Sequence, residues 1–185
     1  MRDTNGGVEN PMDMEFPCIK VTQPIGTFFV AAIDSKLLCE ITCADVERSK
    51  GEREVETYLG IERPLLRAHT IEIEEYLTTT DACFPSAIVI VVDGACFEYL
   101  ETKKSIRLKI YEDKNNPQNS KSRFEIAKVI DGQHRIEALR KYKGDTFQVN
   151  VSIFVSMPLP SQAQVFTALN LARTKERSRL IYDLF

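Results

Sequence analysis

The alternation of apolar and polar positions predicts most of the strands of this chain. Between 147 and 155 every second residue is apolar and its neighbours are polar, so this segment is expected to form a strand with one buried face. Residues 104–111 alternate in the same way and predict a half-exposed strand, with Arg107 and Lys109 on its wet face. Apolar runs predict three further strands at residues 24–33, 85–92 and 124–130. A sheet is therefore the expected centre of the fold.

Helices are predicted where apolar residues recur every three or four positions and where capping signals stand. The spacing predicts a helix over about 65–79, opened by Pro64 and carrying His69, for which a surface or packing role is expected. Capping boxes predict further helix starts at Thr42 and Ser161. The first of these helices would close at Gly51, and the second would end between 170 and 174, with another helix from 177 to 185.

The segment from 124 to 144 compresses a strand, a tight turn and a helix. Its strand breaks at Asp131-Gly132, an apolar stripe with helical spacing follows, and Gly144 offers a left-handed stop. We expect Asp131 to be the N-cap, because its carboxylate can accept the N–H groups that the first helical turn leaves without partners. Together with the strand at 147–155 the segment forms a strand–helix–strand unit, for which a right-handed crossover is expected.

The same turn is an expected anion site. A helix N-terminus presents N–H groups without intrahelical partners and the positive end of the helix dipole, and both favour negative charge. His134 and Arg135 lie in this turn. The pattern therefore predicts a phosphate pocket formed by residues 131–135.

Composition sets the class of protein. With 185 residues, of which 43% are hydrophobic and 28% charged, the sequence is typical of one globular domain. We expect a flexible tail at 1–15 and a single domain at 16–185. The chain stops on an apolar pair, so either it is shortened at its C-terminus or its last helix docks back on the core. No apolar run approaches the ~20 residues that a spanning helix needs, and the polar N-terminus does not resemble a secretory signal. A cytoplasmic protein without a membrane partner is expected.

The charge distribution leaves two interpretations open. The net charge is -3, but residues 103–143 hold twelve basic and five acidic side chains. Such asymmetry can create a positive groove for phosphate chains, or it can reflect a solvated face with ordinary lysines. The five cysteines include no Cys-x-x-Cys and lack the histidine partners of a zinc site, so reduced and mostly buried thiols are expected.

The spelling of the turn resembles a known family. Asp131-Gly-Gln-His-Arg135 is the signature of the DGQHR-domain family, and the chain resembles DndB-type proteins, which are associated with DNA sulfur modification. Further matches stand in the family's order at 60–65, 81–89, Asn170 and 180–184, so the resemblance covers about residues 24–185. Because members of the family commonly continue further, it also favours a shortened chain.

At superfamily level the turn is similar to that of the ParB N-terminal domain and of sulfiredoxin, in which a Gly-x-x-Arg turn holds nucleotide phosphates. The resemblance implies an α/β domain with a mixed sheet and the DGQHR site at a strand–turn–helix junction. Sulfiredoxins carry their reactive cysteine at the place of Gln133. Sulfinic acid reduction is therefore not expected.

Each residue of the turn has a candidate role and a plainer alternative. Arg135 is expected to take two phosphate oxygens with its planar guanidinium, unless it pairs with an acidic neighbour. His134 could donate to the same phosphate or shuttle a proton, or it could pack against the sheet. Gln133 could orient a water for hydrolysis or merely extend the helix, and Gly132 would let the ligand approach the backbone. Asp131 is a secondary candidate for a magnesium ion.

Residues outside the turn complete the predicted site. The ParB-like arrangement brings an arginine close to the phosphate turn, which makes Arg63 a candidate, with an ion pair to a nearby glutamate as its alternative. A basic extension of the surface is expected from Lys103, Arg107, Lys109 and Arg140, while Asn170 and Arg173, which match the family's second motif, are expected to face the same cleft.

The resemblance implies a component of a DNA-modification or phage-defence system that binds DNA, nucleotide or both at the DGQHR turn. Such a protein would regulate or assist the system, together with other proteins of the same operon. The alternative is an NTPase that uses the same turn with a nucleoside triphosphate and Mg²⁺. A further alternative is an interaction domain in which the motif is only a structural cap. No helix-turn-helix motif is evident, which weakens sequence-specific reading of DNA.

Overall fold

The computed structural model describes residues 14–42, 67–110 and 122–182, with side chains described as far as Leu171. The predictions for Arg63, for the segment 43–51, for the loop at 115–121 and for the side chain of Arg173 lie outside these residues. Strand β1 begins at Met14, two residues before the expected domain boundary.

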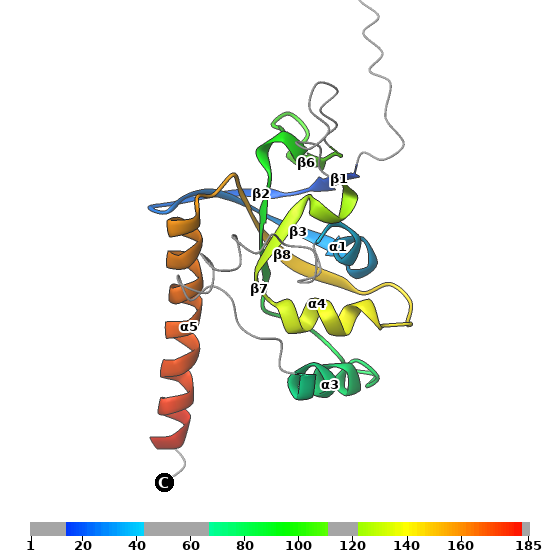
Figure 1. The fold of residues 1–185 in the computed structure, drawn as a ribbon, viewed down its shortest axis with the longest axis vertical. Coiled ribbons are helices and arrows are strands. Elements are labelled where there is room, and N and C mark those ends of the chain that lie inside the picture. Colours follow the sequence, from blue (N-terminus) through cyan, green and yellow to red (C-terminus); the bar gives the residue numbers. More distant parts are fainter. Residues whose placement is uncertain (1–13, 43–66, 111–121, 183–185) are drawn as a thin grey trace, which may run out of the picture.

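Two sheets form the centre of the molecule (Figure 1). The five-stranded sheet has the order β2 (Ile19–Gln23), β3 (Gly26–Asp34), β8 (Gln148–Val155), β4 (Ile88–Val92) and β7 (Ala127–Asp131). The three-stranded sheet has the order β1 (Met14–Pro17), β6 (Ser105–Leu108) and β5 (Phe97–Leu100). Among the described strands, the pairing of β4 with β8 is the only parallel one, so the mixed α and β class is confirmed.

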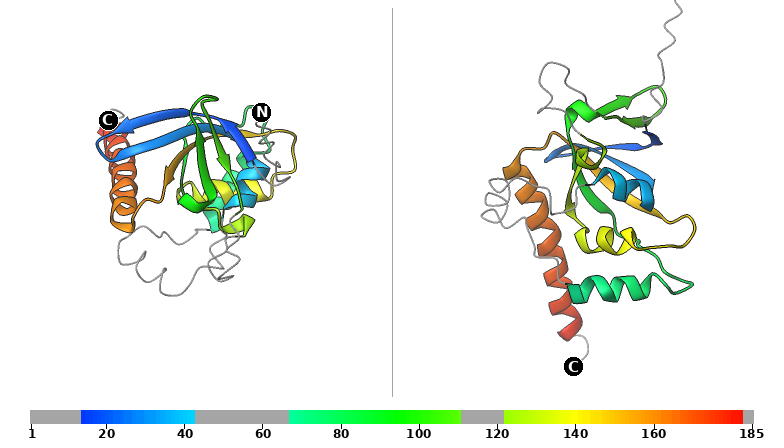
Figure 2. Two further views of the ribbon diagram at one scale, coloured as in Figure 1. Left: turned by 90° about the horizontal axis from the view of Figure 1, so that it is seen from above. Right: turned by 45° about the vertical axis from the view of Figure 1, so that its right-hand side comes forward.

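Helices lie on both faces of the five-stranded sheet (Figures 1 and 2). The helices are α1 (Ser35–Ile41), α3 (Arg67–Tyr76), α4 (Gln133–Arg140) and α5 (Leu159–Tyr182), with short 3₁₀ turns η2 (Gly94–Cys96) and η4 (Arg123–Glu125). Helix α4 packs between α1 and α3 on one face, and α5 covers the other. No helix in the described residues combines the length and the apolar character needed to cross a membrane.

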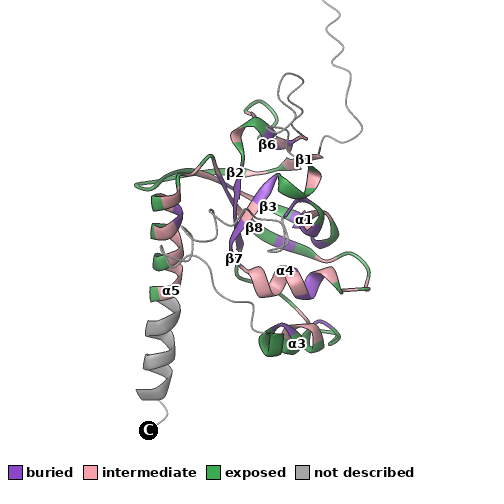
Figure 3. Cartoon of the chain, viewed as in Figure 1, coloured by how far each residue is buried: buried purple, intermediate pink, exposed green. Residues whose placement is uncertain are grey.

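Strand β4 is apolar at every position because both of its faces are buried. All five of its residues are buried (Figure 3). Ile88, Ile90 and Val92 belong to the main core beneath α1 and α4, while Val89 and Val91 belong to the smaller core beneath α5. A strand with helices on both sides needs apolar side chains on both faces. The predicted strands at 24–33, 85–92, 104–111, 124–130 and 147–155 are all confirmed, with shifted ends.

The strand–helix–strand unit at β7, α4 and β8 is not the right-handed crossover that the sequence predicted. Strands β7 and β8 lie on either side of β4, and β7 is antiparallel to β4 whereas β8 is parallel to it. The connection through α4 therefore joins antiparallel strands, so the handedness rule for parallel crossovers does not apply. Sequence spacing could not reveal that β4, which comes earlier in the chain, lies between them.

Two helix boundaries also differ from expectation. Helix α5 runs without a break from Leu159 to Tyr182, through the predicted exit at 170–174. Asparagine and threonine cost less than about 1 kcal/mol in a helix interior, which does not end a helix. Pro160 lies in the first turn, where its missing N–H is no loss. Thr42 is the C-cap of α1, and the helix predicted to open there falls on residues outside those that the structure describes. Helix α4 ends at Arg140, before Gly144.

Replacement of Ile153 by alanine tests the central position of β8. Its side chain is fully buried between β3 and β4, so we expect a loss of about 2–5 kcal/mol in the free energy of unfolding, from lost burial and the cavity left behind. Ile19→Ala, at a residue that is 68% exposed in β2, is the matched control and should change little. Urea unfolding curves of both variants measure the difference. Equal losses would contradict the assigned core.

Glu15 ties β1 to β6 and gives a second test. Its carboxylate accepts hydrogen bonds from Ser105 Oγ at 2.8 Å and from Lys103 Nζ and Arg107 Nη2 at 3.2 Å. The Ser105 hydroxyl is the largest cause that lowers the pKa of Glu15, and the two cations add to it. A lowered folded-state pKa stabilises the fold above the unfolded-state value, and this contribution is lost as the pH falls through the folded-state value. We expect Ser105→Ala to raise the pKa of Glu15 in an NMR titration, with Thr22→Ala as the control that leaves it unchanged.

Candidate functional site

The candidate site is the turn that joins β7 to α4. Gly132 connects them with φ 99° and ψ 17°, a left-handed conformation that glycine adopts without strain. A Cβ atom at this position would lie 3.0 Å from Ile88 Cγ1 and 3.1 Å from Arg135 Nη2. The turn therefore needs glycine both for its backbone conformation and for space.

Asp131 is not the N-cap of α4, which corrects the expectation from sequence. It is the last residue of β7, and Gly132 occupies the N-cap position, where a glycine has no side chain to cap the helix. The carboxylate of Asp131 accepts a hydrogen bond from Arg135 Nη2 at 3.0 Å, and its side chain is 9% exposed. The strand extends one residue further than expected and includes Asp131.

Arg135 fixes the turn against the segment that precedes β4. Its Nη1 atom donates to the carbonyl oxygen of Ser86 at 2.7 Å and to the Ser86 hydroxyl at 3.0 Å. Its Nη2 atom donates to the carbonyl oxygen of Ala87 at 3.2 Å as well as to Asp131. The four N–H directions of the two terminal nitrogens thus meet protein acceptors. In this arrangement the guanidinium positions the turn rather than presenting a free fork to a ligand.

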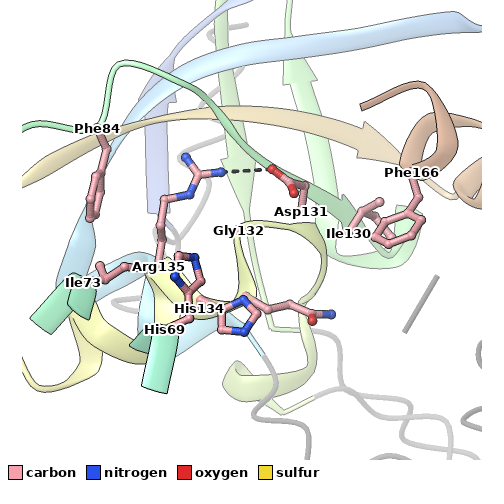
Figure 4. Close-up of a pocket in the computed structure, with 10 residues that line it drawn as sticks. His69, Ile73, Phe84, Ile130, Asp131, Gly132, His134, Arg135 and Phe166 are labelled. Atoms are coloured by element: carbon pink, nitrogen blue, oxygen red, sulfur yellow. Dashed lines mark hydrogen bonds and ion pairs between the residues drawn. The ribbon is translucent and has the colours of Figure 1, made fainter. Parts of the chain in front are cut away.

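A cavity of about 340 Å³ opens beside the turn (Figure 4). Its polar lining comes from the motif residues Asp131, Gln133, His134 and Arg135 and from His69 of α3. Its apolar lining comes from Ile73 and Phe84 near α3 and from Ile130 and Phe166 near α5. The cavity therefore brings together residues from five segments, and all five residues of the predicted turn lie in its wall.

His69 is the residue that sequence reasoning missed. Its ring lies edge-on to that of His134, with ring centroids 5.0 Å apart. Its Nδ1 atom lies 3.2 Å from Glu72 Oε2 of the same helix. The packing of α3 on α4 creates this pair. The one signal in the sequence was that these are the only two histidines of the chain, and spacing could not show that they meet.

The predicted basic residues do not gather around the cavity. Lys103 and Arg107 lie on the three-stranded sheet and contact Glu15, and Arg107 also lies 3.5 Å from Glu98. Half-buried Lys109 follows the same sheet. Arg140 donates to the carbonyl oxygens of Cys39 at 2.7 Å and Thr42 at 2.9 Å, which ties α4 to α1. Asn170 lies half-buried on α5 and does not line the cavity.

The described part of the lining does not form a metal site. The described residues contain no group of three or more histidine, cysteine or acidic side chains placed to hold an ion. Asp131, the candidate for magnesium, directs one carboxylate oxygen to Arg135. The residues present therefore do not fit a protein-held magnesium ion.

The prediction that the cysteines are mostly buried thiols is met in part by the described residues. Four are free thiols, of which Cys39 and Cys96 are buried, Cys18 is half-buried and Cys83 is exposed. Burial raises the pKa of Cys39 to about 11, against a lowering effect of nearby Arg140. Cys39 is thus a packing residue of the α1–α4 contact rather than a nucleophile.

Removal of the Arg135 side chain tests its positioning role. Arg135→Met leaves the Asp131 carboxylate without this partner in a mostly buried site, so we expect a loss of about 3–5 kcal/mol in the free energy of unfolding. Arg67→Met, at an exposed arginine of α3, is the control and should cost little. Chemical unfolding followed by circular dichroism measures both. A loss below that of the control would show that the pair does not hold the turn.

The chain is similar to one known protein family over most of its length. The model of the DndB family, described as DNA-sulfur modification-associated, matches residues 16–184, a span that includes every element around the cavity. Neither the curated proteins nor the solved structures contain a significant match. Because the matched span covers most of the chain, the protein belongs to the DndB family of DNA-sulfur modification-associated proteins.

Proposed function

We propose that this DndB-family protein binds a phosphate-bearing ligand, a nucleotide or DNA, in the cavity beside the Gly132 turn. Family membership gives the protein a role in DNA-sulfur modification. Binding at this cavity would let it regulate or assist that system, together with other proteins of the same operon. The similarity of the turn to the phosphate-binding turns of ParB and sulfiredoxin remains part of this proposal.

One observation carries the proposal: the cavity opens at the N-terminus of α4, where the N-cap residue is a glycine without a side chain. The first N–H groups of α4 have no acceptor within the helix, and Gly132 brings no side chain over them. The positive end of the helix dipole favours an anion at this place. A volume of about 340 Å³ lies within the range of about 300–1000 Å³ typical of small-molecule pockets.

The geometry assigns different roles to the residues of the motif. Gln133 and His134 line the cavity and are the side chains proposed to contact the ligand. Gly132 permits close approach of the ligand to the backbone. Arg135 and Asp131 are proposed to hold the turn in shape, since they bond to each other and to the segment before β4. The basic residues on the three-stranded sheet would belong to a separate surface.

Hydrolysis of a nucleoside triphosphate is the second candidate. It is favoured by the presence of Gln133 and His134 together at the cavity, because an amide can orient a water and an imidazole can move a proton. Any Mg²⁺ would arrive with the phosphates of the nucleotide, since the lining does not fit a protein-held ion.

Ligand binding by variants of the first helical turn tests the proposal. We expect His134→Ala and Gln133→Ala each to weaken nucleotide binding by about tenfold, the loss of one hydrogen bond to a charged group. Gln148→Ala, an exposed glutamine at the start of β8, is the matched control and should bind as the wild type does. Isothermal titration with nucleoside mono- and triphosphates measures the affinity.

Two parallel measurements separate the candidates. Salt-dependent fluorescence anisotropy with duplex DNA detects binding of phosphate chains, and its slope against salt gives the number of phosphates contacted. Release of inorganic phosphate from triphosphates detects hydrolysis. If the protein binds neither nucleotide nor DNA, the proposed function is wrong and the motif is a structural cap of an interaction domain.

A further inference from the structure

His69 extends the candidate site beyond the DGQHR turn. It comes from α3, a helix that precedes the turn by more than fifty residues in the chain and packs against α4. Its ring lines the cavity and lies 5.0 Å from the ring of His134. Figure 4 shows both rings on the same side of the turn. The cavity therefore has a second polar wall that is independent of the motif.

The contact with Glu72 decides which nitrogen of His69 carries the proton. An ionised carboxylate can only accept hydrogen bonds, so the Nδ1 atom, 3.2 Å from Glu72 Oε2, must be the donor. In the neutral ring the other nitrogen, Nε2, is then an acceptor. A carboxylate that holds one ring nitrogen fixes both the tautomer and the orientation of the imidazole. Glu72 is thus a positioning residue for an acceptor at the cavity wall.

The cavity now presents three kinds of surface to a ligand. The N-terminal N–H groups of α4 are donors suited to phosphate oxygens. His69 Nε2, as an acceptor, can take a hydrogen bond from a donor on the ligand. Ile73 and Phe84, which lie beside His69 in the lining, form an apolar surface suited to a flat ring. A ligand that satisfies all three carries a phosphate, a hydroxyl group and a ring system.

We propose that the ligand is a free ribonucleoside phosphate, with a sugar hydroxyl donating to His69 Nε2 and the phosphate at the N-terminus of α4. This inference rests on the proposed phosphate site and narrows it from nucleotide or DNA to one class. An internal DNA nucleotide has no free sugar hydroxyl and cannot make the His69 contact. The described residues of the lining also include no lysine, and the terminal nitrogens of the one arginine among them, Arg135, donate to protein acceptors. These features suit a small ligand better than a DNA chain.

Isothermal titration of the full chain tests the proposal directly. The probes are the common ribonucleoside monophosphates, each paired with its 2′,3′-dideoxy counterpart, and a short DNA duplex. We expect at least one ribonucleotide to bind about tenfold more tightly than its dideoxy counterpart, the effect of one well-formed hydrogen bond. His69→Ala should abolish this preference while binding through the phosphate persists.

The positioning role of Glu72 has its own readout. Because the chain has only two histidines, ring-nitrogen NMR spectra contain two imidazoles, and His69→Ala assigns them. The spectrum of the wild type should show His69 protonated at Nδ1. Glu72→Ala should shift this tautomer and reduce the preference for the hydroxyl, whereas Glu75→Ala, an exposed glutamate on the same helix, should do neither.

The outcomes separate this inference from the proposed function. If the wild-type protein binds ribonucleotides and dideoxynucleotides with equal affinity, the proposed role of His69 is wrong but the phosphate site still stands. Tighter binding of duplex DNA than of any ribonucleotide would also overturn the ligand class and leave the site standing. Absence of binding to every probe would overturn both.

Discussion

The hydrogen bonds of Arg135 are the constraint on which the candidate site depends. One guanidinium connects the end of β7, the start of α4 and the segment before β4, through Asp131, Ser86 and Ala87. Ser86, in the segment before β4, precedes Arg135 by 49 residues, whereas β7 and α4 are separated by Gly132 alone. With the arginine in place, the first turn of α4 has one orientation and the cavity beside it has a defined wall. The arginine thus shapes the site, because its terminal nitrogens donate to acceptors of the protein itself.

This arrangement changes how the DGQHR signature is understood. A motif with an arginine after a glycine turn suggests a direct phosphate clamp, and the sequence supported that interpretation. In the structure the same five residues divide into two groups. Asp131 and Arg135 bond to each other across the turn, while Gln133 and His134 face the cavity. Gly132 separates the two groups and makes both arrangements possible.

The sequence predicted local structure well and relations between distant segments poorly. Strand β8 and the strand–turn–helix at Gly132 followed from periodicity and from glycine chemistry, which are properties of neighbouring residues. The position of β4 between β7 and β8 depends on pairing across the whole chain, and no local pattern encodes it. The same limit explains the site. His134 was found through its motif, but its neighbour His69 became visible only once α3 was packed on α4. Similarly, the count of basic residues between 103 and 143 could not show that Arg140 bonds to main-chain carbonyls of α1.

The tight contact between Gly132 and Ile88 has a consequence for the evolution of this fold. A methyl group at Gly132 would lie 3.0 Å from Ile88 Cγ1 and 3.1 Å from Arg135 Nη2, so alanine would force these neighbours to shift by a few tenths of an ångström. It would also have to adopt a positive φ that side chains rarely tolerate. Ile88 is in turn fully buried in the strand that carries the sheet, so its own freedom to shrink or shift is small. We therefore expect natural variants of this turn to differ at the exposed rim of the cavity and to change little at the residues packed around Gly132.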